Sequence, residues 1–469
     1  MNSEQNPPEL IVSGLLVVPG HPPERGEVHV ANGTIVAVIA GSTADSHGVA
    51  RIDAGRALVF PGAIDCHVHS GSHQGEGITA LTRSAAAGGV TTVVDMPYDA
   101  VGPVDSTEAM QEKIARLSDE AVVDVALLAT VRPDAGAGDV APLVEAGAAG
   151  FKLSTFCTDA YRFPRVSGAQ FLDVLAAVRD SSSVVLVHAE AEDVIKPRID
   201  EARASGDTSP RAHCRSRPPV SETAAVLTAL EYARATDARL HLCHLSLPRS
   251  VDLVRRAVEE GVHATSETCP HYLVFCDEDM DRLGGRLKIN PPVRSAEDRD
   301  AMWGRVLNGA IDVVSSDHAP WPLSYKTKEN IFDNHSGAPG VETLFAIVAG
   351  GIFARGGSAG DVARLLSDGP ARLFGLNNSK GSLEVGKDAD MVFFDPDAAF
   401  VVDEAKLHSN AGWSPYHGLN LSGRVTMAIS RGEVVYDGSE VVGAPGRGRL
   451  LQPGRPHAAN AAAKGDSDG

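Results

Sequence analysis

The sequence predicts an α/β protein, a (β/α)8 barrel of the TIM type with a small β-sandwich beside it. Three observations predict this fold class. Short apolar runs alternate with Ala-rich helical stretches through the middle of the chain, residues 59–377. Strand-like runs separated by turns occupy both flanks, at residues 1–58 and 378–450. No GxGxxG loop follows an early strand, which disfavours an open dinucleotide-binding sheet.

The predicted barrel strands are rich in Val, Ile, Leu and Ala, as expected for a sheet that is buried on both faces. Helical stretches separate them, with apolar residues three and four positions apart. In chain order the strands span residues 62–69, 91–97, 122–130, 148–155, 182–190, 239–246, 262–272 and 311–320. Eight strand–helix repeats fit a closed barrel better than an open sheet.

The flanking runs alternate apolar and polar residues, as strands of a half-buried sheet do. Asn32–Gly33 separates two of these runs and indicates a hairpin. Similar runs return at residues 381–396 and 423–438, so we expect the two ends of the chain to build one composite sandwich. Residues 451–469 contain few large apolar side chains and are expected to form a flexible tail.

The composition is that of a globular protein, with 43% hydrophobic and 22% charged residues. The formal net charge of −19 argues against nucleic acid or an anionic membrane surface as a partner. The six cysteines show no CxxC spacing, which favours reduced thiols in a cytoplasmic protein. The first residues lack the pattern of a signal peptide, and no apolar run is long enough to span a bilayer.

Polar side chains stand at the ends of five predicted strands, and the C-terminal strand ends form the active-site face of such a barrel. His67 and His69 end the first strand. Because residues two apart in a strand share a face, their imidazoles converge. The other polar residues at strand ends are Lys152 on the fourth strand, His188 on the fifth, His244 on the sixth and Asp317 on the eighth. This set of residue types predicts a metal site.

The lysine among these residues suggests two metal ions rather than one. An ammonium buried beside metal cations is strongly destabilising, and burial favours the neutral amine. A neutral lysine amine can add carbon dioxide to become a carbamate, an anionic ligand that can bridge two metals. We therefore predict a binuclear centre with carboxylated Lys152 as the bridge. The more buried ion is assigned to His67, His69 and Asp317, and the second ion to His188 and His244.

The motifs that carry these residues resemble those of the cyclic amidohydrolases of the amidohydrolase superfamily. They are GAIDCHVH, GFKLST, LVHAEAED, LHLCHLS and VVSSDHAP. The resemblance runs from about residue 8 to about residue 450, and all six ligand positions are filled. It implies two divalent metal ions per subunit, zinc first, with cobalt, manganese, nickel or iron as alternatives. It also implies a homotetramer or a homodimer.

Members of this family, which include allantoinase, dihydroorotase and hydantoinase (dihydropyrimidinase), open different rings. Dihydroorotases typically carry an arginine two residues after the second histidine of the first motif, where this sequence has Gly71. The stretches ETCPHYLVF, LKINPPVR and SNAGWSPYHG most resemble allantoinases. The loop after Lys152 departs from allantoinase loops, and Asp99 stands where asparagine is common.

The resemblance therefore implies hydrolysis of a small neutral cyclic ureide or amide, with the conversion of allantoin to allantoate ranked first. One alternative is a hydantoinase, a dihydropyrimidinase or another cyclic imide hydrolase. An alternative of another class is a non-catalytic scaffold that resembles dihydropyrimidinase but has lost metal ligands.

The expected nucleophile is a hydroxide that bridges the two metals. Asp317 is expected to act as general base and then as general acid toward the leaving ring nitrogen. Tyr161 is expected to assist the oxyanion, and Asn290 and Gly340 to contact the substrate. For these three residues the alternatives are structural: a surface tyrosine, an Asn-Pro turn and a glycine hinge.

Overall fold

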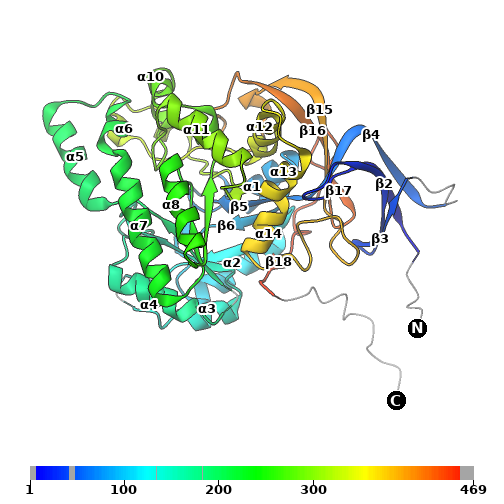
Figure 1. Ribbon diagram of the computed structural model, residues 1–469, viewed down its shortest axis with the longest axis horizontal. Coiled ribbons are helices and arrows are strands. Elements are labelled where there is room, and N and C mark those ends of the chain that lie inside the picture. Colours follow the sequence, from blue (N-terminus) through cyan, green and yellow to red (C-terminus); the bar gives the residue numbers. More distant parts are fainter. Residues whose placement is uncertain (1–6, 42–47, 134, 182, 455–469) are drawn as a thin grey trace, which may run out of the picture.

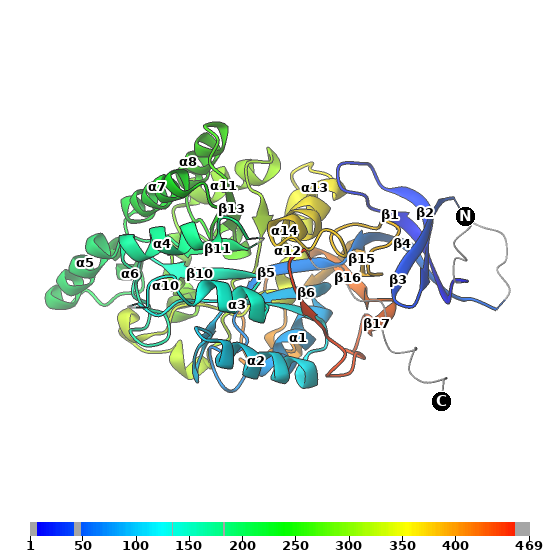
Figure 2. The same ribbon diagram turned by 90° about the horizontal axis from the view of Figure 1, so that it is seen from below.

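The computed structural model describes residues 7–41, 48–133, 135–181 and 183–454. It consists of a parallel barrel surrounded by helices, with a second sheet at one end (Figure 1). Figures 1 and 2 both place helix α5 (Glu192–Ser205) at the opposite end of the molecule from that sheet. No helix in the described residues combines the length and the apolarity needed to cross a membrane.

In the described residues, eight parallel strands form the barrel, and each overlaps one of the eight predicted segments. Their order in the sheet follows the order in the chain. The strands are β5 (Ala63–Val68), β6 (Val90–Asp95), β9 (Asp124–Ala129), β10 (Gly150–Ser154), β11 (Val184–His188), β12 (Leu240–Leu242), β13 (Ala264–Thr268) and β14 (Val313–Val314). The predicted fold class is thereby confirmed.

The barrel closes between its first and last strands through the main chain of His318, four residues beyond β14. The His69 N–H donates to the His318 carbonyl over 2.9 Å, and the His318 N–H donates to the His67 carbonyl over 3.2 Å. The residues that follow β5 and β14 therefore share one rim of the barrel.

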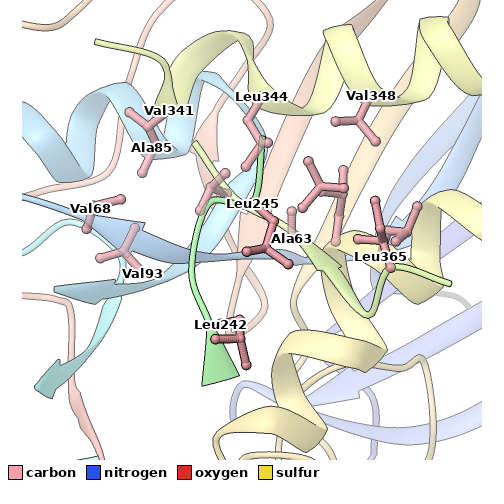
Figure 3. Close-up of a cluster of buried hydrophobic side chains, with 14 of the residues drawn as sticks. Ala63, Val68, Ala85, Val93, Leu242, Leu245, Val341, Leu344, Val348 and Leu365 are labelled. Atoms are coloured by element: carbon pink, nitrogen blue, oxygen red, sulfur yellow. The ribbon is translucent and has the colours of Figure 1, made fainter. Parts of the chain in front are cut away.

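Helices cover the outside of the barrel, and a buried apolar layer lies between them and the strands. Figure 3 shows part of this layer, with side chains from β5, β6, α1 and α12. The helices that follow the barrel strands are α1 (Gly77–Ala87), α2 (Thr107–Glu120), α3 (Val140–Ala146), α4 (Gly168–Val178), α7 (Pro219–Thr236), α8 (Pro248–Glu259), α11 (Ala296–Leu307) and α12 (Val341–Phe353). Shorter helices are α6 (Ala212–Ser216), α9 (Pro270–Val274), α10 (Met280–Leu283), α13 (Ala359–Ala363) and α14 (Gly369–Leu373).

Local sequence explains where these helices lie, and α2 is an example. It begins after Ser106, whose hydroxyl accepts the Ala109 N–H as an N-cap. Its buried residues are Met110, Lys113 and Leu117. These positions are three and four residues apart and therefore form one face of the helix, which packs against the barrel.

The second sheet joins the two ends of the chain, as predicted. Its order is β17-β16-β15-β4-β1-β2-β3, and neighbours are antiparallel except for the parallel pair β1 and β4. Asn32 and Gly33 connect β2 to β3 with φ of 51° and 74°, the left-handed backbone that an Asn-Gly hairpin requires. The strands are β1 (Leu10–Leu16), β2 (Glu24–Ala31), β3 (Thr34–Ala40), β4 (Ala50–Pro61), β15 (Met391–Val401), β16 (Asn420–Ser430) and β17 (Glu433–Tyr436).

A buried ionic cluster fixes the second sheet to the barrel. Lys380 is buried and lies 2.7 Å from Asp124 of β9. The same ammonium lies 2.9 Å from Asp388 and 2.7 Å from Asp390, which precede β15. Because one buried cation serves carboxylates of both units, the sheet has a defined position on the barrel.

The chain returns to the barrel after the second sheet. Strand β18 (Leu450–Leu451) pairs in parallel with β9, and Leu451 is buried. The predicted tail of residues 451–469 thus begins inside a strand, and residues 455–469 lie outside the described residues.

Candidate metal centre

A cavity of about 470 Å³ opens where the barrel strands end. Seven of the nine site residues predicted from the sequence line it. They are His67, His69, Lys152, His188, His244, Asn290 and Asp317. Polar residues from distant parts of the chain thus meet at one place, as the strand-end argument predicts.

The first predicted metal site brings three ligand atoms together. His67 on β5 and His69 just beyond it each place Nε2 3.3 Å from Oδ1 of Asp317. Their spacing is compatible with one ion. Burial, followed by the charge of Lys152, lowers the pKa of His67 to about 4, which leaves a neutral imidazole. Burial raises the pKa of Asp317, but contacts with His67 and His69 outweigh burial and lower it to about 2.

The second predicted site pairs two histidines from neighbouring strands. His188 ends β11, and His244 follows β12 by two residues. Nδ1 of His188 lies 3.1 Å from Nε2 of His244. Burial and the charge of Lys152 hold the pKa of His244 well below its usual value. Two ring nitrogens placed in this way can bind one ion together.

Lys152 on β10 lines the same cavity as both pairs, and its charge helps to lower the pKa of His67 and of His244. Its Nζ is buried and has no hydrogen-bond partner within the described part of the chain. A bare ammonium in this position is strongly unfavourable. The nitrogen fits a lysine that carries a further group, and a carbamate would supply anionic ligands to both sites.

The backbone is strained at two of the predicted ligands. His244 and Asp317 have φ of 38° and 47°, a region that residues other than glycine rarely adopt. Such strain persists only where surrounding contacts enforce it, and it is concentrated at functional sites. Here it turns both side chains toward the cavity at the ends of short strands.

Two buried glutamates orient the histidines, and the sequence analysis missed both. Oε1 of Glu267 lies 3.0 Å from Nδ1 of His67 and accepts the His244 backbone N–H over 2.9 Å. Oε2 of Glu190 lies 2.8 Å from Nε2 of His188. These contacts leave Nε2 of His67 and Nδ1 of His188 for an ion, as carboxylates behind metal-binding histidines do.

Of the three predicted substrate contacts, one lines the cavity and two lie outside its lining. Asn290 lines the cavity, and its Oδ1 is a buried acceptor without a partner in the described residues. Tyr161 is 72% exposed and lies outside the cavity lining, in a loop where its backbone N–H donates to Oδ1 of Asp159 over 3.0 Å. Gly340 also lies outside this lining, and its N–H donates to Nδ1 of His318 over 3.1 Å.

The tyrosine that does line the cavity is Tyr98, in the hairpin β7 (Tyr98–Asp99) and β8 (Gly102–Pro103). Arg162 lies over its ring, 4.5 Å from the centroid, and donates from Nη2 to the Tyr98 hydroxyl oxygen over 3.2 Å. Burial raises the pKa of Tyr98 to about 12, so the phenol keeps a proton that it can donate.

Gly71 and Asp99 form one arrangement beside the cavity, next in the chain to the lining residues Ser72 and Tyr98. A Cβ at Gly71 would lie 2.1 Å from Oδ1 of Asp99. Lys113 holds this carboxylate through a 2.8 Å contact from Nζ and also lies 3.0 Å from Asp95. The Asp99 carboxylate therefore fills the space in which an arginine side chain at position 71 would begin.

Comparison with known proteins decides the family. The model of the amidohydrolase family matches residues 58–435. The chain belongs to the amidohydrolase family. It is 38% identical to an allantoinase of Rubrobacter xylanophilus, over 95% of this chain and 98% of that protein. It is 34% identical to an allantoinase of Deinococcus radiodurans, over 95% of this chain and 99% of that protein.

The structural comparison agrees with this assignment. The L-hydantoinase (dihydropyrimidinase) from Arthrobacter aurescens superposes with a TM-score of 0.92 at 30% identity, covering 95% of this chain and all of that one. The resemblance to amidohydrolases found in the sequence is thus confirmed. As an amidohydrolase the protein is a hydrolase of cyclic amides, from a family that generally binds a binuclear metal centre.

Proposed function

We propose that this amidohydrolase opens the ring of a small neutral cyclic ureide, with allantoin as the first candidate and allantoate as its product. One observation carries the proposal: four histidines, Lys152 and Asp317 converge on a single cavity at the ends of the barrel strands. The similarity to two allantoinases over nearly the full length of the chain supports this substrate.

The proposed centre holds two divalent ions, zinc first, with a carbamate on Lys152 as the shared ligand. The donor chemistry fits: burial holds the imidazoles of His67 and His244 neutral, the Asp317 carboxylate is ionised, and the buried Lys152 nitrogen has no hydrogen-bond partner among the described residues. Cobalt, manganese, nickel and iron suit the same donors. When bound, such ions polarise a carbonyl group and lower the pKa of water toward neutrality.

Asp317 is the proposed general base. Its depressed pKa keeps the carboxylate ionised, and it lies on the cavity wall beside His67 and His69. It accepts a proton from the attacking water, whose oxygen bonds to the ring carbonyl carbon. The same proton then passes to the ring nitrogen as the C–N bond breaks, which leaves an open-chain acid.

Two further residues are proposed to hold the ring. The Oδ1 of Asn290, which has no hydrogen-bond partner among the described residues, is suited to accept a ring N–H. The protonated Tyr98 hydroxyl is suited to donate to a carbonyl oxygen, the part that the sequence analysis gave to Tyr161. The aromatic side chains of Phe156, Phe163 and Trp321 line the same cavity and reduce the access of water.

The rim of the cavity favours a neutral ring over an acidic one. Dihydroorotate carries a carboxylate, and Gly71 supplies no cation at the clamp position, while the Asp99 carboxylate that fills the space beside it is paired with Lys113. An unpaired and partly desolvated charge costs several kcal/mol. Allantoin is neutral, and its ureido group can form hydrogen bonds without a charged partner.

A hydantoinase-type activity is the second candidate, because the L-hydantoinase superposes with a TM-score of 0.92. A cavity of about 470 Å³ also has room for a substituted ring. A non-catalytic scaffold is disfavoured because all six ligand positions are filled. On the family resemblance we further propose a cytoplasmic homotetramer or homodimer in purine catabolism.

The test is a hydrolysis panel on metal-replete protein, with allantoin, hydantoin, dihydrouracil, dihydroorotate and succinimide. We expect kcat/KM to be highest for allantoin and lower by at least about a hundredfold for dihydroorotate, because Gly71 stands where a clamping arginine would pair with the carboxylate. Turnover of dihydroorotate equal to that of allantoin would refute the argument from the rim. Hydrolysis of hydantoin without hydrolysis of allantoin would replace the proposed substrate with that of the second candidate.

A further inference from the structure

The sequence stretch SNAGWSPYHG, residues 409–418, contributes no residue to the cavity lining, yet it contacts loops at the cavity rim. Nε1 of Trp413 donates to the carbonyl of Trp321 over 2.7 Å, four residues beyond Asp317. Nδ2 of Asn410 donates to the carbonyl of Gly75 over 2.9 Å. This segment, between β15 and β16, therefore supports the rim from outside the barrel.

The segment also binds the buried carboxylate of Glu76, which immediately precedes α1. The Asn410 backbone N–H donates to Oε2 of Glu76 over 2.8 Å, and the Ser409 hydroxyl donates to the same oxygen over 3.1 Å. The other oxygen, Oε1, lies 3.4 Å from Nε2 of His318. Glu76 thus connects the 409–418 segment to the residue next to Asp317.

The side chain of His318 is held in one orientation. Its Nδ1 accepts the N–H of Gly340 over 3.1 Å and that of Val341 over 3.3 Å, at the start of α12. A ring nitrogen that accepts hydrogen bonds carries no hydrogen, so in the neutral ring the hydrogen is on Nε2 and points to Glu76. The main chain of His318 is the link that closes the barrel between His67 and His69.

Asp317 lies between these restraints in a left-handed conformation, with φ of 47°. A residue other than glycine holds such a conformation only when its surroundings impose it. On its C-terminal side that restraint is His318, whose main chain and side chain are both fixed. Loss of the contact between Glu76 and His318 would therefore shift the Asp317 carboxylate, because only one peptide unit separates His318 from Asp317.

We infer that Glu76 and His318, held by the 409–418 segment, are positioning residues that fix the Asp317 carboxylate against the metal centre. The inference rests on the proposed role of Asp317 as metal ligand and base. It gives a structural role to residues 409–418, which lie about ninety residues beyond Asp317, the last proposed ligand in the sequence. Positioning partners behind metal ligands typically contribute about 10–100-fold in metal affinity or activity.

Glu76→Gln is the informative variant because it keeps the shape of the side chain. One amide oxygen cannot accept hydrogen bonds from both His318 and the Ser409–Asn410 pair, so one of the two connections is lost. The matched control is Glu404→Gln. Glu404 accepts the Ser414 N–H of the same segment over 3.0 Å and pairs with Arg286. Within the described part of the chain it forms no hydrogen bond or ion pair with His318 or Asp317.

The measurements are metal affinity by chelator competition, together with kcat and KM on the ring that the wild-type protein opens fastest. For Glu76→Gln we expect metal affinity or kcat to fall by about 10–100-fold, with KM unchanged within about twofold. Glu404→Gln is expected to match the wild type. His318→Asn, which keeps an acceptor for α12 but does not reach Glu76, is expected to reproduce the loss if Glu76→Gln folds poorly.

Wild-type metal affinity and kcat in Glu76→Gln or in a folded His318→Asn would overturn the inference, as would an equal loss in Glu404→Gln. The metal measurement separates this inference from the proposed function. If the wild-type protein opened none of the rings, the proposed substrate class would fail, whereas weakened metal binding in Glu76→Gln would still support the positioning of Asp317.

Discussion

Lys152→Ala is expected to abolish turnover, by more than about a thousandfold, and to lower the metal content of the protein. The physical reason is the loss of the anionic ligand that both metal sites are proposed to share. Kinetics on the preferred ring and elemental analysis of the purified variant measure the two effects. A short carboxylic acid added to Lys152→Ala is expected to restore part of the activity, because the vacated space can hold a carboxylate in place of the carbamate.

Lys152→Arg is the matched control for this prediction. Arginine keeps the positive charge and most of the length of the side chain, but it forms no carbamate and stays protonated. We expect it to be as inactive as the alanine variant and not to respond to added carboxylic acid, since its side chain fills the space. Wild-type turnover in either variant would show that Lys152 does not bridge the metals.

Asp317→Asn is expected to lower kcat by about 10²–10⁴-fold, the usual contribution of a general acid–base group. The amide has nearly the same shape and leaves the other five ligands in place, so much of the metal is expected to remain bound. The loss should therefore appear in turnover more than in metal content, which elemental analysis can show. A loss of less than about tenfold would mean that another residue moves the proton.

A carboxylate of the same cavity provides the control for Asp317→Asn. Asp333 lines the cavity but pairs with Arg203 at the surface, where its side chain is 52% exposed. We expect Asp333→Asn to keep kcat within about threefold, because exposed ion pairs contribute little. An equal loss in both variants would indicate a general effect of cavity charge rather than proton transfer at Asp317.

The barrel and the convergence of the six candidate metal ligands on one cavity could be predicted because both follow from local patterns. The sequence of a strand that is buried on both faces is a continuous run of apolar residues, and eight such runs alternate with helices. A polar side chain at the end of such a run seldom stabilises the fold, so its presence there favours a functional role. His188 and Lys152 were found for this reason, and both line the cavity.

The parts that the sequence did not reveal depend on contacts between distant segments. Glu267 is 200 residues from His67, and a glutamate in a strand gives no sign that it is buried behind a histidine. Tyr98 and Tyr161 are both tyrosines on loops after strands, and only the folded loops place one inside the cavity and the other outside. Glu190 had a usable signal, because it stands two residues after His188 and shares its face.

The Gly71–Asp99 arrangement shows how two separate observations in a sequence can have one cause. Each position departs from a family pattern, and the sequence gives no link between them. In the structure the Asp99 carboxylate occupies the space beside Gly71, fixed there by Lys113. The pair therefore leaves no room for a clamping arginine at position 71, and the comparison of dihydroorotate with neutral rings in the substrate panel tests this.

The central claim is that a metal centre performs the hydrolysis, and the metal content of the wild-type protein tests it most directly. Elemental analysis of purified protein, with turnover measured before and after treatment with a strong chelator, is the required measurement. We predict up to two divalent ions per chain, loss of activity on chelation and its return when zinc or another divalent ion is added. Full turnover by protein shown to be free of metal would contradict the account.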